Sequence, residues 1–521
     1  MTTDANGLSS RIPMSRRAAL GIMGGTALAS GLIVPQSTLR AQAKRGGSLK
    51  VGLSTGNTND LLDPARVLDT GSFLILATLG NYLVELTPDK MAIPELAESW
   101  ESSDRAKRWV FKIRKGVQFH NGKPLTPADV VYSISRHMGE NSKSPAKPFL
   151  TGVQSVRADG DAVVVEHETG DADLPLTFST PWFAIVPEGH TDWQKFIGTG
   201  PYVLASYDPG VRFKATRNPN YWKPNRAWFD DIEGIVIVDP TARTNALVAG
   251  EVMVVDRLPP NVVELVKRSN KFKIIDGIGT RYTSIAVDVR ATPFDNKHVR
   301  DAIKLGVNRD DIVQKVFRGY ATVGNDHPIP SNDPMFNKAL AQRNYDPDKA
   351  KWHLKQAGLD SVPLKLSTAD AAFAGAIDAA VLVQASAAKA GLNIELVREP
   401  NDGYWSNVWK KKPFTMANFN LRPAPSHIFG ISFACGANWN DAFWCNDRFE
   451  TLHKEGRVET DVANRKAIYG EMQEIVHNDG GGAIFAFPSN VDAHALNIRG
   501  NELDAVGILC GYRIAERAWL A

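Results

Sequence analysis

The chain has 521 residues, 43% of them hydrophobic and 22% charged, which is ordinary for a globular protein and suggests about three domains. Its 60 Lys and Arg residues outnumber its 57 Asp and Glu residues by three, and residues 1–43 carry that whole excess. Residues 44–521 therefore hold 56 residues of each sign, and this neutral body excludes a nucleic-acid-binding protein, which needs clustered cations to neutralise phosphates.

The N-terminal segment, residues 1–43, has the pattern of an export signal. Ser15-Arg16-Arg17 precedes the apolar run Ala18–Val34, and Ala41-Gln42-Ala43 supplies a cleavage site, so the sequence predicts that Lys44 begins the mature chain. The paired arginines favour a twin-arginine signal, with a Sec signal that contains two arginines as the alternative. The apolar run is too short and too rich in Gly and Ala to favour a membrane span.

The cysteines and histidines predict a disulfide and no metal site. After residue 43 no apolar run is long enough for a membrane helix, so we expect a soluble, exported chain in an oxidising compartment. Cys435 and Cys445 lie ten positions apart in a loop-like stretch and are predicted to form a disulfide, with two free thiols as the alternative. No histidines stand at zinc-ligand spacing, so we predict no metal ligands and no cofactor.

The periodicity predicts strands and helices mixed along the chain. Ser48–Leu53 alternates as a strand, and Arg108–Arg114 alternates apolar with more polar residues in the same way. Thr126 is a natural N-cap with Pro127 at the first helical position, which predicts a helix to about His137. Later expected elements are a helix capped by Thr241 and ended by Gly250, a strand at Val252–Val255, and helices at Lys297–Leu305, from Asp346 to Gly358, at Ala371–Ala390 and near Asp461–His477. The composition is that of an α/β protein with more than one lobe.

Three stretches carry a family resemblance. They are Leu96–Trp100 with Trp109–Thr126, then Gly198–Tyr202 with Arg217–Trp222, and finally Pro293–Ile303 continuing to Gly319. In this order they closely resemble the solute-binding proteins of peptide/nickel-type ABC importers, the oligopeptide- and dipeptide-binding family. The similarity runs from about residue 46 to 500. Within the first motif we expect His120 to serve the turn rather than a ligand.

The resemblance implies a two-lobed, Venus-flytrap-like α/β fold with an extra inserted domain. The first lobe would comprise residues 44–80, 197–280 and 489–521, the inserted domain 81–196 and the second lobe 281–488. Hinge strands would lie near Gly277–Val287 and Ile484–Pro488. The resemblance also implies a monomeric periplasmic protein that closes on a small molecule or short peptide and delivers it to the transmembrane subunits of an ABC permease, which work with cytoplasmic ATPases.

Residues 401–445 of the second lobe interleave aromatic and polar side chains, as a binding cleft requires. Its candidate ligand-binding residues are Tyr404, Trp405, Phe419, Asn420, Arg422, Trp439, Asn440 and Asp441. Arg422 offers a fork of donors suited to a carboxylate, and Asp441 could hold an ammonium group or cap a turn. We expect Trp409 and Phe414 to lie in the core instead. Further candidates are Tyr282 on the expected hinge strand, and Asp69 and Phe73 in the first lobe.

The identity of the solute is left open by one departure from the family. Many dipeptide-binding relatives carry an aspartate for the peptide amino group where this chain has Leu421 or Arg422. A peptide or peptide-like solute is therefore one expectation, and an opine, a sugar conjugate or a metal chelate is another. The chain has no G-x-S-x-G, H-E-x-x-H or phosphate-loop motif, so we predict no enzyme. The rival is an exported hydrolase on the same scaffold with Asp441 or another cleft carboxylate as its base.

Overall fold

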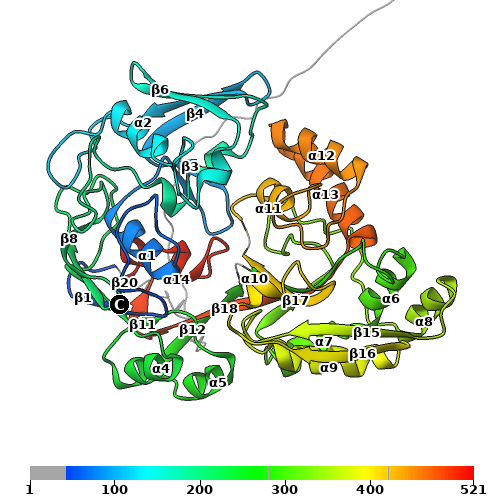
Figure 1. The fold of residues 1–521 in the computed structure, drawn as a ribbon. Coiled ribbons are helices and arrows are strands. Elements are labelled where there is room, and N and C mark those ends of the chain that lie inside the picture. Colours follow the sequence, from blue (N-terminus) through cyan, green and yellow to red (C-terminus); the bar gives the residue numbers. More distant parts are fainter. Residues whose placement is uncertain (1–42, 280, 421) are drawn as a thin grey trace, which may run out of the picture. The chain divides into compact units, whose positions relative to one another are not determined.

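The computed structural model describes residues 43–279, 281–420 and 422–521 (Figure 1). The export signal predicted at residues 1–43 falls almost wholly outside the described residues. Ala43–Ala521 forms one compact unit. Among its described helices, none is both long enough and apolar enough to cross a membrane.

A twelve-stranded sheet runs through this unit in the order β16-β15-β17-β13-β18-β11-β1-β10-β9-β8, with β12 and β14 also paired to β18. Its first half holds β1 (Ser48–Leu53), β8 (Tyr202–Asp208), β9 (Arg212–Arg217), β10 (Asp231–Val236), β11 (Val254–Val255) and β12 (Phe272–Ile278). Its second half holds β13 (Arg281–Val287), β14 (Ala321–Val323), β15 (Val362–Thr368), β16 (Leu392–Arg398) and β17 (Phe414–Asn420). The long strand β18 (Ala483–Ala495) belongs to both halves (Figure 1).

Strand β18 changes partners along its length. Its first part pairs with β13 and β14, and its last part pairs with β12 and β11. The change falls between Pro488, opposite β14, and Ser489, opposite β12. Beside it, a Cβ added to Gly279 would lie 1.9 Å from the Pro488 carbonyl oxygen, so glycine is required where β12 leads into β13. The two expected hinge segments are thus adjacent, and hinge motion there remains a prediction.

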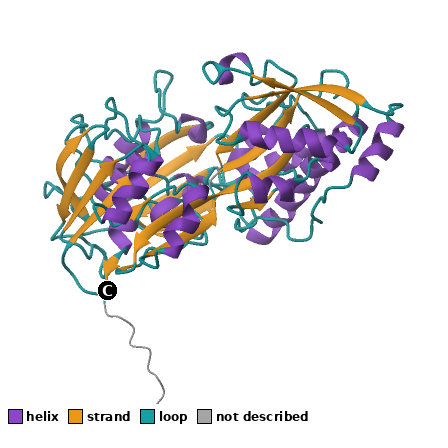
Figure 2. Cartoon of the chain, turned by 90° about the horizontal axis from the view of Figure 1, so that it is seen from below, coloured by secondary structure: helices purple, strands orange, loops and turns teal. Residues whose placement is uncertain are grey.

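Each half of the sheet carries its own apolar core and its own helices (Figure 2). In the first half, α1 (Thr70–Leu79), α14 (Ile508–Gly511) and α15 (Ile514–Arg517) contribute buried residues to the main apolar core. Helices α4 (Pro240–Ala249) and α5 (Pro260–Arg268) contribute to a second, smaller apolar cluster. The second half packs α6 (Lys297–Gly306), α7 (Arg309–Lys315), α8 (Pro347–Gln356) and α9 (Ala376–Ala388). Buried leucine, valine and phenylalanine side chains on both kinds of element supply the favourable free energy.

A separate antiparallel sheet forms within residues 81–196, the range expected for the inserted domain. Its order is β4-β5-β7-β6, from β4 (Ala97–Ser103), β5 (Arg108–Ile113), β6 (Val153–Asp159) and β7 (Ala162–His167). Its core includes residues of α2 (Pro127–Ser135) and α3 (Leu174–Thr177), and short β2 (Val84–Leu86) and β3 (Ala92–Pro94) pair beside it. We keep the domain boundaries given above as a proposal.

The segment after β17 is mainly helical and contains a disulfide. It comprises α11 (Pro425–Ser432), α12 (Asp447–Val458) and α13 (Val462–Asp479). The short helix α10 (Tyr404–Asn407) lies before β17. Cys435 and Cys445 form a disulfide in the loop between α11 and α12, and Cys510 is a buried free thiol. The C-terminus closes with β19 (Ile498–Arg499) paired to β20 (Trp519–Leu520).

Some expected boundaries differ from those observed. Helix α4 is capped by Asp239, which accepts a hydrogen bond from the Ala242 amide, so the predicted cap at Thr241 is wrong. Pro240 explains the difference, because proline favours the first helical position, and the cap is then the residue before it, Asp239. The expected helix at Ala371–Ala390 starts only at Ala376, after Gly375 in a left-handed conformation. Helix α2 starts at Pro127 as expected and has a complete capping box between Thr126 and Asp129.

Candidate ligand-binding site

A cavity of about 500 Å³ is lined by residues from both halves of the large sheet. The first half contributes the loop after β1, the start of α1, the loop after β11 and the C-terminal segment 504–517. The second half contributes the start of β13 and the end of β17 with the residues after it. A volume of this size suits a small organic molecule.

Aromatic side chains form one wall of the cavity. The Phe73 ring, on α1, meets Trp182 edge-on with centroids 5.1 Å apart and Tyr512 with centroids 5.6 Å apart. The Trp182 indole N–H donates to the backbone carbonyl of Val67, which fixes the orientation of the ring. This wall is suited to an apolar or planar part of a ligand.

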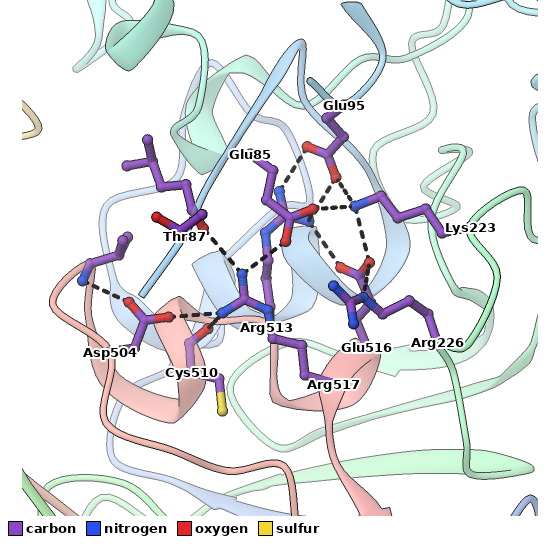
Figure 3. A network of polar contacts seen from close by, with 12 residues as sticks. Glu85, Thr87, Glu95, Lys223, Arg226, Asp504, Cys510, Arg513, Glu516 and Arg517 are labelled. Atoms are coloured by element: carbon purple, nitrogen blue, oxygen red, sulfur yellow. Dashed lines mark hydrogen bonds and ion pairs between the residues drawn. The ribbon is translucent and has the colours of Figure 1, made fainter. Parts of the chain in front are cut away.

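Six basic side chains line the cavity, and three of them already pair with carboxylates. Two of these three belong to one ion network that a ligand does not need to complete (Figure 3). Arg513 donates to both carboxylate oxygens of Glu95, at 2.7 and 2.8 Å, and to Glu516 at 2.9 Å. Arg517 bridges Glu85 and Asp504, each at 2.9 Å. Lys90, the third, pairs with Asp333 at 3.2 Å outside this network.

Lys223 completes the same network from the loop after β9. Its ammonium group lies 2.7 Å from Glu85, 2.6 Å from Glu95 and 3.0 Å from Glu516. Burial alone would raise the pKa of Glu516, but the charges of Lys223 and Arg513 lower that pKa to about 2. The network is therefore ionised and internally neutralised, and it fixes the C-terminal segment that lines the cavity.

The other three basic residues are Arg257, Arg281 and Arg422, and no described carboxylate lies within ion-pair distance of them. Burial and the nearby Arg257 charge lower the pKa of the Arg281 guanidinium to about 10. Burial also lowers the pKa of Arg422. The Nε atoms of Arg257 and Arg422 are buried without a hydrogen-bond partner among the residues that the structure describes. These guanidinium groups are thus available to an anion.

The two carboxylates that line the cavity are both engaged. Asp69 is the N-cap of α1: it accepts hydrogen bonds from the amides of Gly71 and Ser72 and from the Thr55 hydroxyl, at 2.9 to 3.1 Å. Asp504 pairs with Arg517 and accepts the Val506 amide at 2.7 Å. Both carboxylates therefore already accept hydrogen bonds; Asp504 is also neutralised by Arg517, whereas no described cation lies within ion-pair distance of Asp69.

The sequence-derived candidates are divided between this cavity and other places. Asp69, Phe73, Asn420 and Arg422 line the large cavity. Tyr282, Phe419, Asn440 and Asp441 line a separate, small cavity of about 30 Å³. In that region the Asn440 amide donates to the carbonyls of Ala434 and Trp444, so it braces the disulfide loop. Asp441 accepts the Trp409 indole N–H at 3.0 Å, and burial raises the pKa of Asp441 to about 6.

Tyr404, Trp405 and Trp439 do not line the large cavity. Tyr404 is 1% exposed in the core, and its hydroxyl donates to the Met416 carbonyl at 2.8 Å, a position that does not favour its expected ligand role. Trp405 and Trp439 are exposed on the surface at 41% and 43%. The Arg422 guanidinium lies over the Trp439 ring at 5.1 Å, which links that residue to the cavity indirectly. Most of the aromatic density of residues 401–445 therefore serves packing.

Two of the three unpaired arginines were missed by the sequence analysis. Arg281 is the neighbour of the chosen Tyr282, and neighbouring residues of a strand point to opposite faces. Arg257 follows β11 with a φ of 47°, a left-handed conformation that is rare for arginine and that no pattern in the sequence signals. The C-terminal lining was missed for a similar reason, since Leu509, Cys510 and Tyr512 all have positive φ.

A second cluster of ionisable groups lies on α6 and α8, outside the large cavity. The Nδ1 atoms of His298 and His353 are 2.9 Å apart, and Asp301 lies 3.8 Å from the latter. These groups could together hold a metal ion, which the sequence analysis did not foresee because they come from two helices. Asp301 is, however, already paired with Lys297 at 2.7 Å.

Comparison with known proteins decides the family. Residues 92–440 match the family of bacterial extracellular solute-binding proteins, family 5. The chain belongs to this family. Members of family 5 are binding proteins that work with ABC permease and ATPase components, and their two-lobed α/β fold is also the fold of this chain. The resemblance found in the sequence motifs is therefore confirmed.

Individual family 5 relatives match nearly the whole chain. The dipeptide-binding protein of Escherichia coli K12 is 25% identical over 538 residues, which cover 90% of this chain and 98% of that protein. The structure of HbpA2 from Haemophilus parasuis superposes with a TM-score of 0.81 at 22% identity, over 91% of this chain and all of that one. The structure of AgaA from A. tumefaciens R10 in complex with agropinic acid has a TM-score of 0.73 at 22% identity, over 91% and 99%.

Proposed function

We propose that this family 5 protein is the periplasmic substrate-binding component of an ABC importer and that it captures a small solute bearing a carboxylate. The observation that carries the proposal is the cavity of about 500 Å³ with three unpaired guanidinium groups. A planar guanidinium fork matches the two oxygens of a carboxylate. Delivery to the permease subunits follows from membership of the family.

The solute would be held between the two halves of the sheet. Arg257 and the Phe73 wall come from the first half, whereas Arg281 and Arg422 come from the second. A solute that contacts both halves only when they approach shifts the population toward the closed state. Opening at the β12–β13 connection and β18, where the permease favours the open state, would then release the solute.

Several classes of solute have the required carboxylate. A short peptide has one at its C-terminus, and the E. coli relative is a dipeptide-binding protein. An opine also has one, and AgaA was determined with agropinic acid. Sugar conjugates and metal chelates with acidic groups fit the same description. The position of Asp441 does not favour it as the base of the rival hydrolase, because Asp441 lines the small cavity and accepts a hydrogen bond from Trp409.

Export belongs to the same proposal. Residues 1–43 would direct the chain to the periplasm, after which Lys44 would begin a soluble, monomeric mature protein. Sequencing the N-terminus of protein recovered from the periplasm of its host tests this step, and an intact Met1 on exported protein would contradict it.

Native mass spectrometry of gently purified periplasmic protein tests solute capture. We expect an adduct of defined mass that is recovered chemically unchanged, which excludes turnover. If the purified protein carries no adduct, a thermal-shift panel of peptides, opines and chelates follows. A true ligand at 100 times its dissociation constant adds about 2.7 kcal/mol to the free energy of unfolding. Turnover of a bound compound, or failure of both experiments, would overturn the proposal.

A further inference from the structure

We propose that the solute carries at least two negatively charged groups, and that the protein binds it without recognising a free ammonium group. This inference rests on the proposed function and concerns the same cavity. It assigns a substrate class, an organic dicarboxylate or tricarboxylate with an apolar or planar part, for which one example is an amino acid acylated on nitrogen by a diacid.

The charge count of the cavity supports two or more anionic groups. Arg257, Arg281 and Arg422 bring three positive charges that no described carboxylate pairs. Burying an unpaired cation is costly, and an opposite charge supplied by the ligand removes that cost. One carboxylate accepts the donors of one or two guanidinium groups, so a single anionic group would leave part of this charge uncompensated.

The protein's own acids behind the cavity do not replace the ligand charge. Asp256 and Asp492 are the acids whose charges interact with Arg257, but neither lies within ion-pair distance of it. Asp256 accepts hydrogen bonds from the amide and hydroxyl of Ser54. Burial raises the pKa of Asp492 to about 7, so near neutral pH a large part of it is uncharged.

The arginines are placed on different segments around the cavity, as two separate anionic groups require. Arg281 begins β13 directly opposite Asn420 of β17, and Arg422 follows two positions further along the chain. Arg257 reaches the cavity from the other half of the sheet, on a backbone held at a φ of 47°. Such a conformation costs free energy and persists where the surrounding structure imposes it, often at a binding site.

A zwitterionic peptide fits this cavity poorly at its amino end. The lining carboxylates, Asp69 and Asp504, are occupied by the α1 cap and by Arg517. A free ammonium group would therefore enter a site in which three unpaired positive charges outnumber Asp69, the lining carboxylate that no described cation pairs. Converting that amine to an amide removes the repulsion, and placing a second carboxylate there replaces it with attraction.

The experiment compares three ligands of similar size by calorimetry and thermal shift. They are trialanine, which is zwitterionic, N-acetyl-trialanine with one negative charge, and N-succinyl-dialanine with two. We expect affinity to rise in that order, with at least a tenfold gain from trialanine to the succinyl compound. The gain should shrink as salt is raised, since charge pairing is screened.

Two variants sharpen the test. Arg281→Gln should weaken binding of N-succinyl-dialanine at least tenfold and that of N-acetyl-trialanine less, while thermal stability is kept because no ion pair is lost. Arg268→Gln, at an exposed position on α5, is the matched control and should change neither affinity.

The outcomes separate this inference from the proposed function. If trialanine binds as tightly as N-succinyl-dialanine or more tightly, or if Arg281→Gln leaves the affinity for N-succinyl-dialanine unchanged, the inference that the solute carries two negative charges is overturned. The proposal that the protein captures a solute would still stand. If no probe binds, the charge of the solute that co-purifies from the periplasm decides: a neutral or zwitterionic solute also overturns the inference. Absence of any bound solute and of any response to the panel would overturn the proposed function itself.

Discussion

Replacing Arg513 by Met tests how the buried ion network supports the cavity. Arg513 makes three contacts of 2.7 to 2.9 Å with Glu95 and Glu516, both of them fully buried. Without it, Lys223 would be the closest cation left to compensate the two carboxylates. Removing one partner of a buried ion pair costs about 3–5 kcal/mol, and we expect a loss of that size at pH 8.

The loss should be smaller at pH 4.5 than at pH 8. Lys223 and Arg513 hold the folded-state pKa of Glu516 near 2, so this carboxylate stabilises the fold above its unfolded pKa and the contribution is lost as the pH falls. In Arg513→Met that pKa rises, and protonation at low pH relieves part of the uncompensated charge.

Urea unfolding at both pH values measures the effect. The matched control is Arg448→Met, which removes an exposed pair with Glu471 at 2.7 and 2.9 Å. Exposed pairs contribute about 0–1 kcal/mol, so the control should lose little. Equal losses in the two variants, or a loss in Arg513→Met that does not depend on pH, would refute the reasoning.

Three further predictions concern stability. Replacing Cys435 and Cys445 by Ser should lower the free energy of unfolding by about 2–4 kcal/mol, and reductant should then have no further effect on the variant in urea unfolding. Because burial raises the pKa of Asp492 to about 7, its contribution to stability is present at low pH and falls as the pH rises from the unfolded value through 7; Asp492→Asn should flatten this dependence in thermal melts between pH 4 and pH 8. Tyr404→Phe removes one buried hydrogen bond to the Met416 carbonyl and should cost about 1 kcal/mol without changing the affinity for any solute, whereas a change in affinity by calorimetry would return Tyr404 to the site.

The sequence predicted the fold more completely than the site. The motif Trp109–Thr126 contains part of strand β5 and the cap of α2. Strands, turns and caps depend mainly on residues close together in the sequence, so the sequence can predict them. Arg422 was chosen because its guanidinium suits a carboxylate and because it lies in the stretch that interleaves aromatic and polar residues, and it does line the cavity. Tyr404 was misplaced, since composition does not distinguish an aromatic wall from an aromatic core.

The residues that the sequence did not reveal depend on long-range structure. Arg257 reaches the cavity because a left-handed residue follows β11, and β11 is held by β18, which lies more than 200 positions later. The pairing of His298 with His353 depends in the same way on α6 packing against α8. No spacing within a single element contains this information.

The participation of β18 and the C-terminal segment in the first half of the sheet constrains the order of folding during synthesis. Arg513 pairs with Glu95 across 418 positions, and β11 pairs with β18 near the end of the chain. A ribosome-bound chain that has completed residues 48–278 therefore contains Lys223 but lacks β18 and the two arginines, Arg513 and Arg517, that complete this half. The carboxylates at positions 85 and 95 obtain their full set of cations only when residues 513 and 517 have been made, so the C-terminal wall of the cavity is the last part of this half to be assembled.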